Sequence, residues 1–148
     1  MKKIMLAGVA ALLAGGLYAQ TLKESAVPAV VKSSFTKMFP NAKSVKWSKE
    51  SATEFEAEFK NGSLTQAANF DASGSWVVTE TEIKKADLPG PVAKAIAKDF
   101  AGYKTGESEK VEKPNKPMYF EVKVEKGEVG YVLEISPEGK ILKKEKDV

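Results

Sequence analysis

Three glutamates, Glu54, Glu56 and Glu58, alternate with apolar residues in the segment 54–59. In an extended strand, alternate side chains share one face and lie about 7 Å apart. Carboxylates at this spacing could serve as a glycosidase pair or as a cation site. The same pattern is typical of strand residues that face water and keep a sheet soluble. We favour this second interpretation for the three glutamates.

The chain has no histidine and no cysteine. This excludes a Ser-His-acid triad, imidazole and thiolate metal ligands, cysteine nucleophiles and disulfides. No glycine-rich phosphate-binding loop is present, and the segment 71–74 reads as a turn and not as a calcium loop. We therefore expect no catalytic residue, no cofactor and no metal site, and we predict that the protein is not an enzyme.

Aromatic residues beside charged ones offer a different kind of site, a surface for a partner. Tryptophan is enriched at binding hot spots, although Trp47 and Trp76 are also suited to packing within a sheet. Tyr119 would supply an anchor of low conformational entropy, and the nearby glutamates would select a basic partner. The candidate partner-binding residues are Glu54, Glu56, Glu58, Trp76, Tyr119, Glu121 and Lys123.

The elements that must position these residues occur twice along the chain. Segments 27–39 and 88–100 each contain an apolar residue, then a proline, then apolar residues at helical spacing. A proline is tolerated in the first helical turn, where its missing N–H costs nothing. The two predicted stripes are Val27, Val31, Phe35 and Phe39 in the first copy, and Leu88, Val92, Ile96 and Phe100 in the second.

Strands are repeated in the same way, in segments 55–62 and 120–127, which end in the turn pairs Asn61-Gly62 and Lys126-Gly127. Further strands are expected at 44–48, 64–70 and 76–81, and at 109–113, 129–135 and 140–144. We expect a core between helix and sheet that contains Phe35, Phe39, Phe55, Phe59, Ile96, Phe100, Val122 and Val124.

The predicted fold is therefore α+β: a tandem repeat of two units, residues 20–84 and 85–148, each a helix followed by antiparallel strands. A unit of about 60 residues buries little surface alone, so the two should share a core or a continuous sheet. Segment 82–87 is too short for a free linker, which agrees with close packing. The helices would cover one face of the sheet and leave the other face open.

The N-terminus has the pattern of a signal peptide. Lys2 and Lys3 precede an apolar run, Ile4 to Leu17, that is too short to span a membrane and ends near Ala19. We expect residues 1–19 to be removed, which leaves a periplasmic or secreted protein without a stable membrane anchor. The chain has 23 basic and 20 acidic residues. Without the two N-terminal lysines it is nearly neutral, so no nucleic-acid partner is indicated.

The apolar-proline helix starts, the charged alternating strands, the Phe-Asp-x-x-Gly turn at 70–74 and the strand with Trp76 resemble the PepSY-like, β-lactamase-inhibitor-like family of exported bacterial proteins. The resemblance runs from about Val27 to the end. It implies two tandem units in an extended antiparallel sheet with helices behind it, and no catalytic residue. Pro91, Gln66 and Ala68 depart from the pattern, and we expect them to weaken the sheet packing.

These observations predict an exported, non-catalytic binding protein that engages an extracytoplasmic protein or peptide through the open sheet face. The alternative is a periplasmic carrier of a small molecule or ion, which would need a cavity. An antiparallel sheet can also leave one face to water without any function. A pocket would favour the carrier, and an open face with aromatic residues would favour the binding protein.

Overall fold

The computed structural model describes residues 20–147, in which nine strands and two α-helices are present. The predicted signal peptide, residues 1–19, lies outside the described residues. The strands are β1 (Gln20–Leu22), β2 (Ala42–Lys49), β3 (Glu54–Asn61), β4 (Leu64–Asp71), β5 (Trp76–Glu82), β6 (Lys104–Glu112), β7 (Tyr119–Lys126), β8 (Val129–Ile135) and β9 (Ile141–Asp147). The α-helices are α1 (Ala29–Met38) and α2 (Gly90–Asp99), each preceded by a short 3-10 turn.

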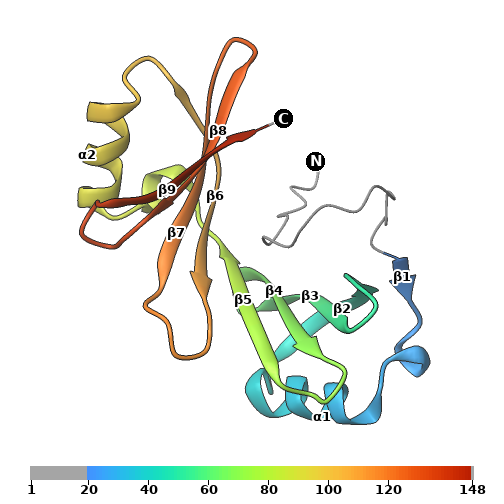
Figure 1. Cartoon of the computed structure of the whole chain (residues 1–148). Helices are drawn as coiled ribbons and strands as arrows, with labels where there is room; N and C mark the ends of the chain where they lie inside the picture. Colours follow the sequence, from blue (N-terminus) through green and yellow to red (C-terminus); the bar gives the residue numbers. More distant parts are fainter. Residues whose placement is uncertain (1–19, 148) are drawn as a thin grey trace.

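All nine strands form one antiparallel sheet in which each strand pairs with its neighbours in sequence, from β1 to β9. Figure 1 shows that this sheet is strongly twisted, with α1 against its first half and α2 against its second half. The fold is therefore α+β with an open antiparallel sheet. The halves meet where β5 and β6 pair over four residues, from Thr79↔Glu112 to Glu82↔Glu109.

Each α-helix starts directly after a proline, as the sequence predicts. Pro28 and Pro89 occupy the N-cap positions with extended backbone, so neither has to donate a helical hydrogen bond. Both helices end in the same way: the Phe39 N–H donates to the Phe35 carbonyl, and the Phe100 N–H donates to the Ile96 carbonyl.

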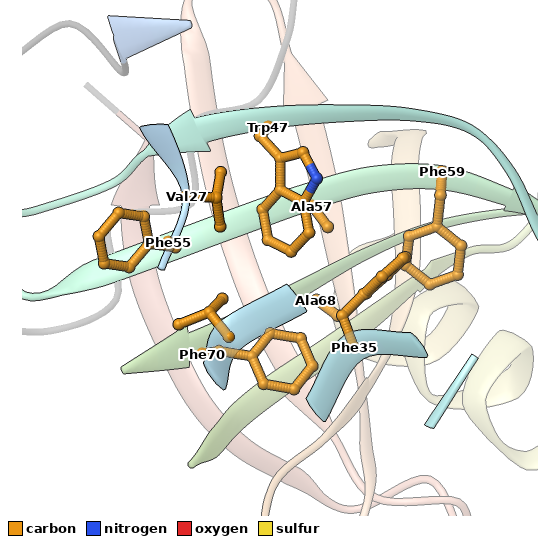
Figure 2. Close-up of a cluster of buried hydrophobic side chains, with 9 residues drawn as sticks. Val27, Phe35, Trp47, Phe55, Ala57, Phe59, Ala68 and Phe70 are labelled. Carbon is orange, nitrogen blue, oxygen red and sulfur yellow. The ribbon is translucent and has the colours of Figure 1, made fainter. Parts of the chain in front are cut away.

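The core under α1 is largely aromatic (Figure 2). The Phe35 ring lies at its centre, with ring centroids 5.2 Å from Trp47, 5.0 Å from Phe59 and 6.3 Å from Phe70. These pairs are edge-to-face, the arrangement that aromatic quadrupoles favour. Helix α1 is thereby held against β2, β3 and β4.

The core under α2 is mainly aliphatic and forms a separate cluster. Its fully buried members include Val92 from the helix, Val122 and Val124 from β7, and Leu133 and Ile135 from β8. The residues expected in the two cores are all buried except Phe39, which is half-buried. Phe39 is the C-cap of α1, at the rim of the cluster, where its ring lies 4.6 Å from Phe59.

Two strands are longer than expected because each contains a bulge. The segment expected at 44–48 is β2, with a register shift between Lys43 and Lys46, where Ser44 has a φ of 55°. The segment expected at 109–113 is β6, which begins at Lys104 and has a shift between Thr105 and Ser108. An irregular residue breaks the alternation that marks a strand, which is why the sequence pattern was shorter.

Two glycine turns press directly against the starts of the helices. A Cβ on Gly139, in the β8–β9 turn, would lie 2.5 Å from the Pro91 carbonyl oxygen. A Cβ on Gly74, in the β4–β5 turn, would lie 2.9 Å from Ser34 Oγ. Both glycines also have φ above 80°, which an L side chain rarely adopts. The turns therefore fix each helix against the end of its strands.

The expected weakness at Gln66 and Ala68 is not found. Ala68 is fully buried in the α1 cluster. Gln66 is 9% exposed, and its amide donates to Thr81 Oγ1 at 2.9 Å and accepts from Asn61 Nδ2 at 3.0 Å. A buried amide with both groups paired is compatible with a stable sheet.

The strand register places both α-helices on the same side of the sheet. Ala68, beneath α1, is opposite Thr79 on β5, and Thr79 is opposite Glu112 on β6. Directly opposite residues of an antiparallel pair share a face. On the next pairs along, Thr81 is opposite Lys110, and Lys110 is opposite Phe120 beneath α2. We call the other side of the sheet the open face.

Candidate functional site

The open face carries a row of four glutamates on four adjacent strands. Glu82 on β5 is opposite Glu109 on β6, Glu109 is opposite Glu121 on β7, and Glu121 is opposite Glu134 on β8. Adjacent strands are about 4.8 Å apart, so the row extends for about 14 Å across the sheet. Like charges directly opposite each other destabilise a sheet. We call these four residues the glutamate row.

The centre of the open face is not a flat surface exposed to water. Val111 is 1% exposed, and Glu121 is 7% exposed. Asn69 and Val78, which are opposite each other on β4 and β5, are also buried. Glu54, Glu56 and Glu58, which were expected to face water, are half-buried.

Burial and mutual repulsion raise the pKa values of the central glutamates. Loss of solvation raises the pKa of Glu121 to about 8, and the charges of Glu109 and Glu80 add to this. Loss of solvation likewise raises the pKa of Glu109 to about 7 and that of Glu56 to about 7, again with contributions from neighbouring carboxylates. The pKa of Glu80 is raised as well, chiefly by burial. Several of these groups therefore share protons near neutral pH.

One buried carboxyl oxygen lacks a hydrogen-bonding partner within the described part of the chain. Glu109 Oε2 is buried and accepts no hydrogen bond there. Leaving a buried polar group unpaired costs about 1–3 kcal/mol. The unpaired Glu109 Oε2 is therefore costly to the fold.

A tyrosine and a lysine border the glutamate row. Tyr119 on β7 is opposite Val111 and accepts a hydrogen bond from Lys113 Nζ at 3.0 Å. Lys113 Nζ also lies 5.5 Å from the centre of the Tyr119 ring. The positive charge of Lys113 partly offsets the repulsion that raises the pKa of Glu121.

The register places six of the seven residues predicted as partner-binding on the open face. Glu54, Glu56 and Glu58 lie on β3, where Glu56 Oε1 accepts a hydrogen bond from Ser48 Oγ at 3.3 Å. Tyr119, Glu121 and Lys123 lie on β7. The charge of Glu56 on β3 contributes to the raised pKa of Glu109, a member of the glutamate row. Lys123 instead pairs with Asp147 on β9, at 2.5 Å.

Trp76, the seventh candidate, lies on the helix side of the sheet. It is opposite Phe70, packs against the α1 cluster and donates its indole N–H to Thr79 Oγ1 at 2.9 Å. A bulge between Val78 and Trp76 separates the two residues onto opposite faces. Trp76 therefore does not join the other six candidates.

Four further glutamates of the open face, Glu80, Glu82, Glu109 and Glu134, were not selected from the sequence. Alternation does mark Glu80 and Glu82 as sharing one face of β5, because Thr79 and Thr81 are buried on the other. The proximity of these residues to Glu121 depends on how β5, β6 and β7 pair, and single strands carry no such information.

The remaining features of the described chain are less suited to a site. Within residues 20–147 no group of three or more acidic side chains is arranged to hold a metal ion. A groove of about 370 Å³ lies beside α2, lined mainly by small and apolar side chains such as Ala93, Ala97 and Phe100. Neither helix of this part is long and apolar enough to cross a membrane.

The protein therefore belongs to the class of α+β proteins in which helices cover one face of an open antiparallel sheet. Here the other face of the sheet is rich in carboxylates. The family model described as "Putative beta-lactamase-inhibitor-like, PepSY-like" matches residues 18–65 and 53–143. The chain belongs to this PepSY-like family. No match was found among curated proteins.

Solved structures show the same fold. A BLIP-like protein from Bacteroides fragilis is 27% identical, with a TM-score of 0.74 over 80% of this chain and 86% of that chain. A DUF2874 family protein from Bacteroides ovatus is 28% identical, with a TM-score of 0.75 and the same shares covered. A protein from Bacteroides eggerthii, described as "putative periplasmic", is 22% identical with a TM-score of 0.75, over 81% and 88%. This last similarity concerns the fold alone.

Proposed function

We propose that the protein is an exported, non-catalytic binding protein that engages a protein or peptide through the open face. One observation carries the proposal: Glu109 Oε2 is buried on this face and accepts no hydrogen bond from the described part of the chain. A fold tolerates such a cost when the group serves a partner. Tyr119, adjacent on β7, adds a half-buried aromatic ring.

The tandem arrangement supports this use of the sheet. We interpret residues 20–84 and 85–148 as two units, each with one α-helix and its own core, joined edge to edge through β5 and β6. Joining two small sheets produces a platform wider than either unit. Both helices lie on the other side of the sheet, so neither helix covers this platform.

Export is proposed from the N-terminal pattern of two lysines, an apolar run and Ala19. Mass spectrometry of the protein from its native host should find Gln20 at the N-terminus. An intact Met1 on protein recovered from the cytoplasm would contradict export.

The absence of enzymatic activity is also proposed. The chain has no histidine or cysteine, and we assign no cofactor or metal. Purified protein should therefore not turn over peptide, lactam or glycoside substrates. Turnover that a single substitution abolishes would show that a catalytic site exists.

Site-specific photo-crosslinking tests the proposed surface. A photoreactive phenylalanine analogue in place of Tyr119 should capture a specific partner in the cell envelope. The same analogue in place of Lys94, an exposed residue of α2, is the matched control on the opposite side of the sheet. Crosslinks from position 94 and none from position 119 would place the working surface on the helices.

The captured partner then permits a quantitative test. The double variant Glu56→Lys with Tyr119→Ala should weaken its binding at least about tenfold, since a charge and an anchor are both lost. The melting temperature should change little. If affinity is unaffected while Lys94→Glu abolishes binding, the open face is not the binding surface.

The carrier alternative has one observation in its favour, the groove beside α2. Its lining would suit a small apolar molecule and not an ion. An environment-sensitive apolar dye should bind there only if the groove works as a pocket. Ala97→Trp, which fills the groove, should then remove the dye signal without changing binding at the open face.

A further inference from the structure

The glutamate row has the chemistry of a receptor for positive charge. Its central members, Glu109 and Glu121, are opposite each other on β6 and β7. Glu121 is buried and Glu109 is half-buried. Burial is the largest cause of the raised pKa of each residue, and the charges of neighbouring carboxylates add to it. A cation placed beside these groups would offset the repulsion between the carboxylates.

Resident cations do not neutralise the row. Lys113 Nζ is hydrogen-bonded to Tyr119, and its charge lowers the pKa of Glu121 less than the carboxylates raise it. Lys143 on β9 is opposite Glu134 at the end of the row and forms an ion pair with Glu145 at 2.7 Å. The buried Oε2 of Glu109 accepts no hydrogen bond from the described residues. This unpaired atom and the buried residue Glu121 lie next to each other on adjacent strands.

Resting on the proposed function, we propose that the open face binds an extended, arginine-bearing segment of its partner, with a guanidinium group placed between Glu109 and Glu121. A metal ion fits less well, because these carboxylates do not converge as metal ligands. A guanidinium presents five N–H donors in a planar fork and is more weakly hydrated than an ammonium group. It can donate to carboxylates on two adjacent strands at once and loses less on burial than lysine does.

The length of the row matches a short segment with alternate basic residues. Alternate side chains of an extended peptide are about 7 Å apart, so three alternate arginines would span the row of about 14 Å. Glu82 at one end of the row is exposed, and Glu134 on β8 is half-buried. Glu82 and Glu134 would therefore contact the outer arginines of the segment, while Glu109 and Glu121 would hold the central arginine.

The charges that face the central pair predict how pH affects binding. Those acting on Glu121 are Glu80, Glu109, Glu134 and Lys113. Those acting on Glu109 are Glu56, Glu80, Glu82 and Glu107, and Glu121 is directly opposite it. Acidic groups dominate both sets. A bound guanidinium lowers the carboxyl pKa values, so binding releases protons and affinity should increase from about pH 6 to about pH 8.5.

The experiment uses the protein from Gln20 onward, which contains every described element, and a fluorescent peptide with arginine at alternate glycine-separated positions. The control peptides carry citrulline, which is isosteric and uncharged, or lysine at the same positions. The arginine peptide should bind with proton release, the lysine peptide should bind more weakly, and the citrulline peptide should not bind. Equal affinity for all three peptides, or for the arginine and lysine peptides, would overturn the proposal.

Variants localise the binding. Glu109→Gln with Glu121→Gln should reduce affinity for the arginine peptide at least about tenfold. Glutamine keeps the side-chain volume and removes the repulsion, so the fold should be retained, which circular dichroism checks. Glu24→Gln with Glu128→Gln removes the same charge at two exposed positions elsewhere and should have no effect. Equal losses in the two double variants would show only nonspecific attraction and overturn the proposal.

The outcome is separable from that of the proposed function. A partner crosslinked at position 119 together with failure of the arginine peptide would reject the arginine site and leave the binding surface in place. Failure to obtain any crosslink from position 119, with crosslinks from position 94, rejects the surface itself and the arginine site with it.

Discussion

Glu109 on β6 and Glu121 on β7 are directly opposite each other on the open face, where two like charges would normally be avoided. Both have a pKa raised to about 7 or above, chiefly by burial. The pair therefore makes the stability of the protein depend on protonation.

The free energy of unfolding should decrease as the pH rises from about 5 to about 9. Glu56, Glu109 and Glu121 have folded-state pKa values of about 7, 7 and 8, above the ordinary value of 4.5. The folded state thus binds more protons than the unfolded state in this window. The stabilisation is fully present below about pH 4.5 and is lost as the pH passes 7 to 8. Urea titrations at several pH values should show a loss of at least about 2 kcal/mol.

Glu121→Gln should increase stability at about pH 8.5 by about 1–2 kcal/mol, since it removes a buried charge without changing the volume. At about pH 5, where Glu121 is protonated, the variant should match the parent. Glu128→Gln, at an exposed hairpin position, should have no effect at either pH. A destabilised Glu121→Gln variant at high pH would mean that this carboxylate has a stabilising partner.

Gly139→Ala should destabilise the protein by about 2–4 kcal/mol. The new Cβ would lie 2.5 Å from the Pro91 carbonyl oxygen, at a φ of 89°. Gly127→Ala is the matched control, because its φ is 61° and nothing lies within 4 Å. The control should cost only the backbone strain, about 1–2 kcal/mol. Equal losses in chemical denaturation would show that the β8–β9 turn does not press against α2.

Phe35→Ala should cost about 3–5 kcal/mol, because Phe35 is 6% exposed at the centre of the aromatic cluster in Figure 2. Phe39→Ala, one helical turn away and half-buried, should cost less than half as much. Thermal and urea unfolding of the two variants measure the difference. The reverse order would mean that α1 presents a different face to the sheet.

Much of the fold could be predicted from local pattern. Alternation in segments such as 55–59 and 120–124 identifies strands, and the Val27–Phe39 and Leu88–Phe100 stripes identify helices, because these periods reflect burial on one side. The turn pair Asn61-Gly62 likewise marks a hairpin that the structure contains, with Asn61 opposite Leu64. Such features depend on residues that are close together in the chain.

The orientation of Trp76 shows where local pattern is insufficient. Strict alternation would place Trp76 and Val78 on one face, but a bulge between them turns Trp76 toward Phe70 and Val78 toward Asn69. A single extra residue reverses the face of every following side chain. The bulge is a feature of the pairing between β4 and β5, and no residue type in the segment 76–78 indicates it.

The sequence alone determined the repeated helices and hairpins, and it assigned Glu56, Tyr119 and Glu121 to the face away from the helices. Only the tertiary structure decided that Glu121 is buried and adjacent to Glu109. The surroundings of this pair also depend on the pairing of β5 with β6, which joins the two halves of the sheet. These two strands are separated in the sequence by α2. Burial of a charge and the identity of its neighbours are properties of residues distant in sequence, and the chain must fold before either exists.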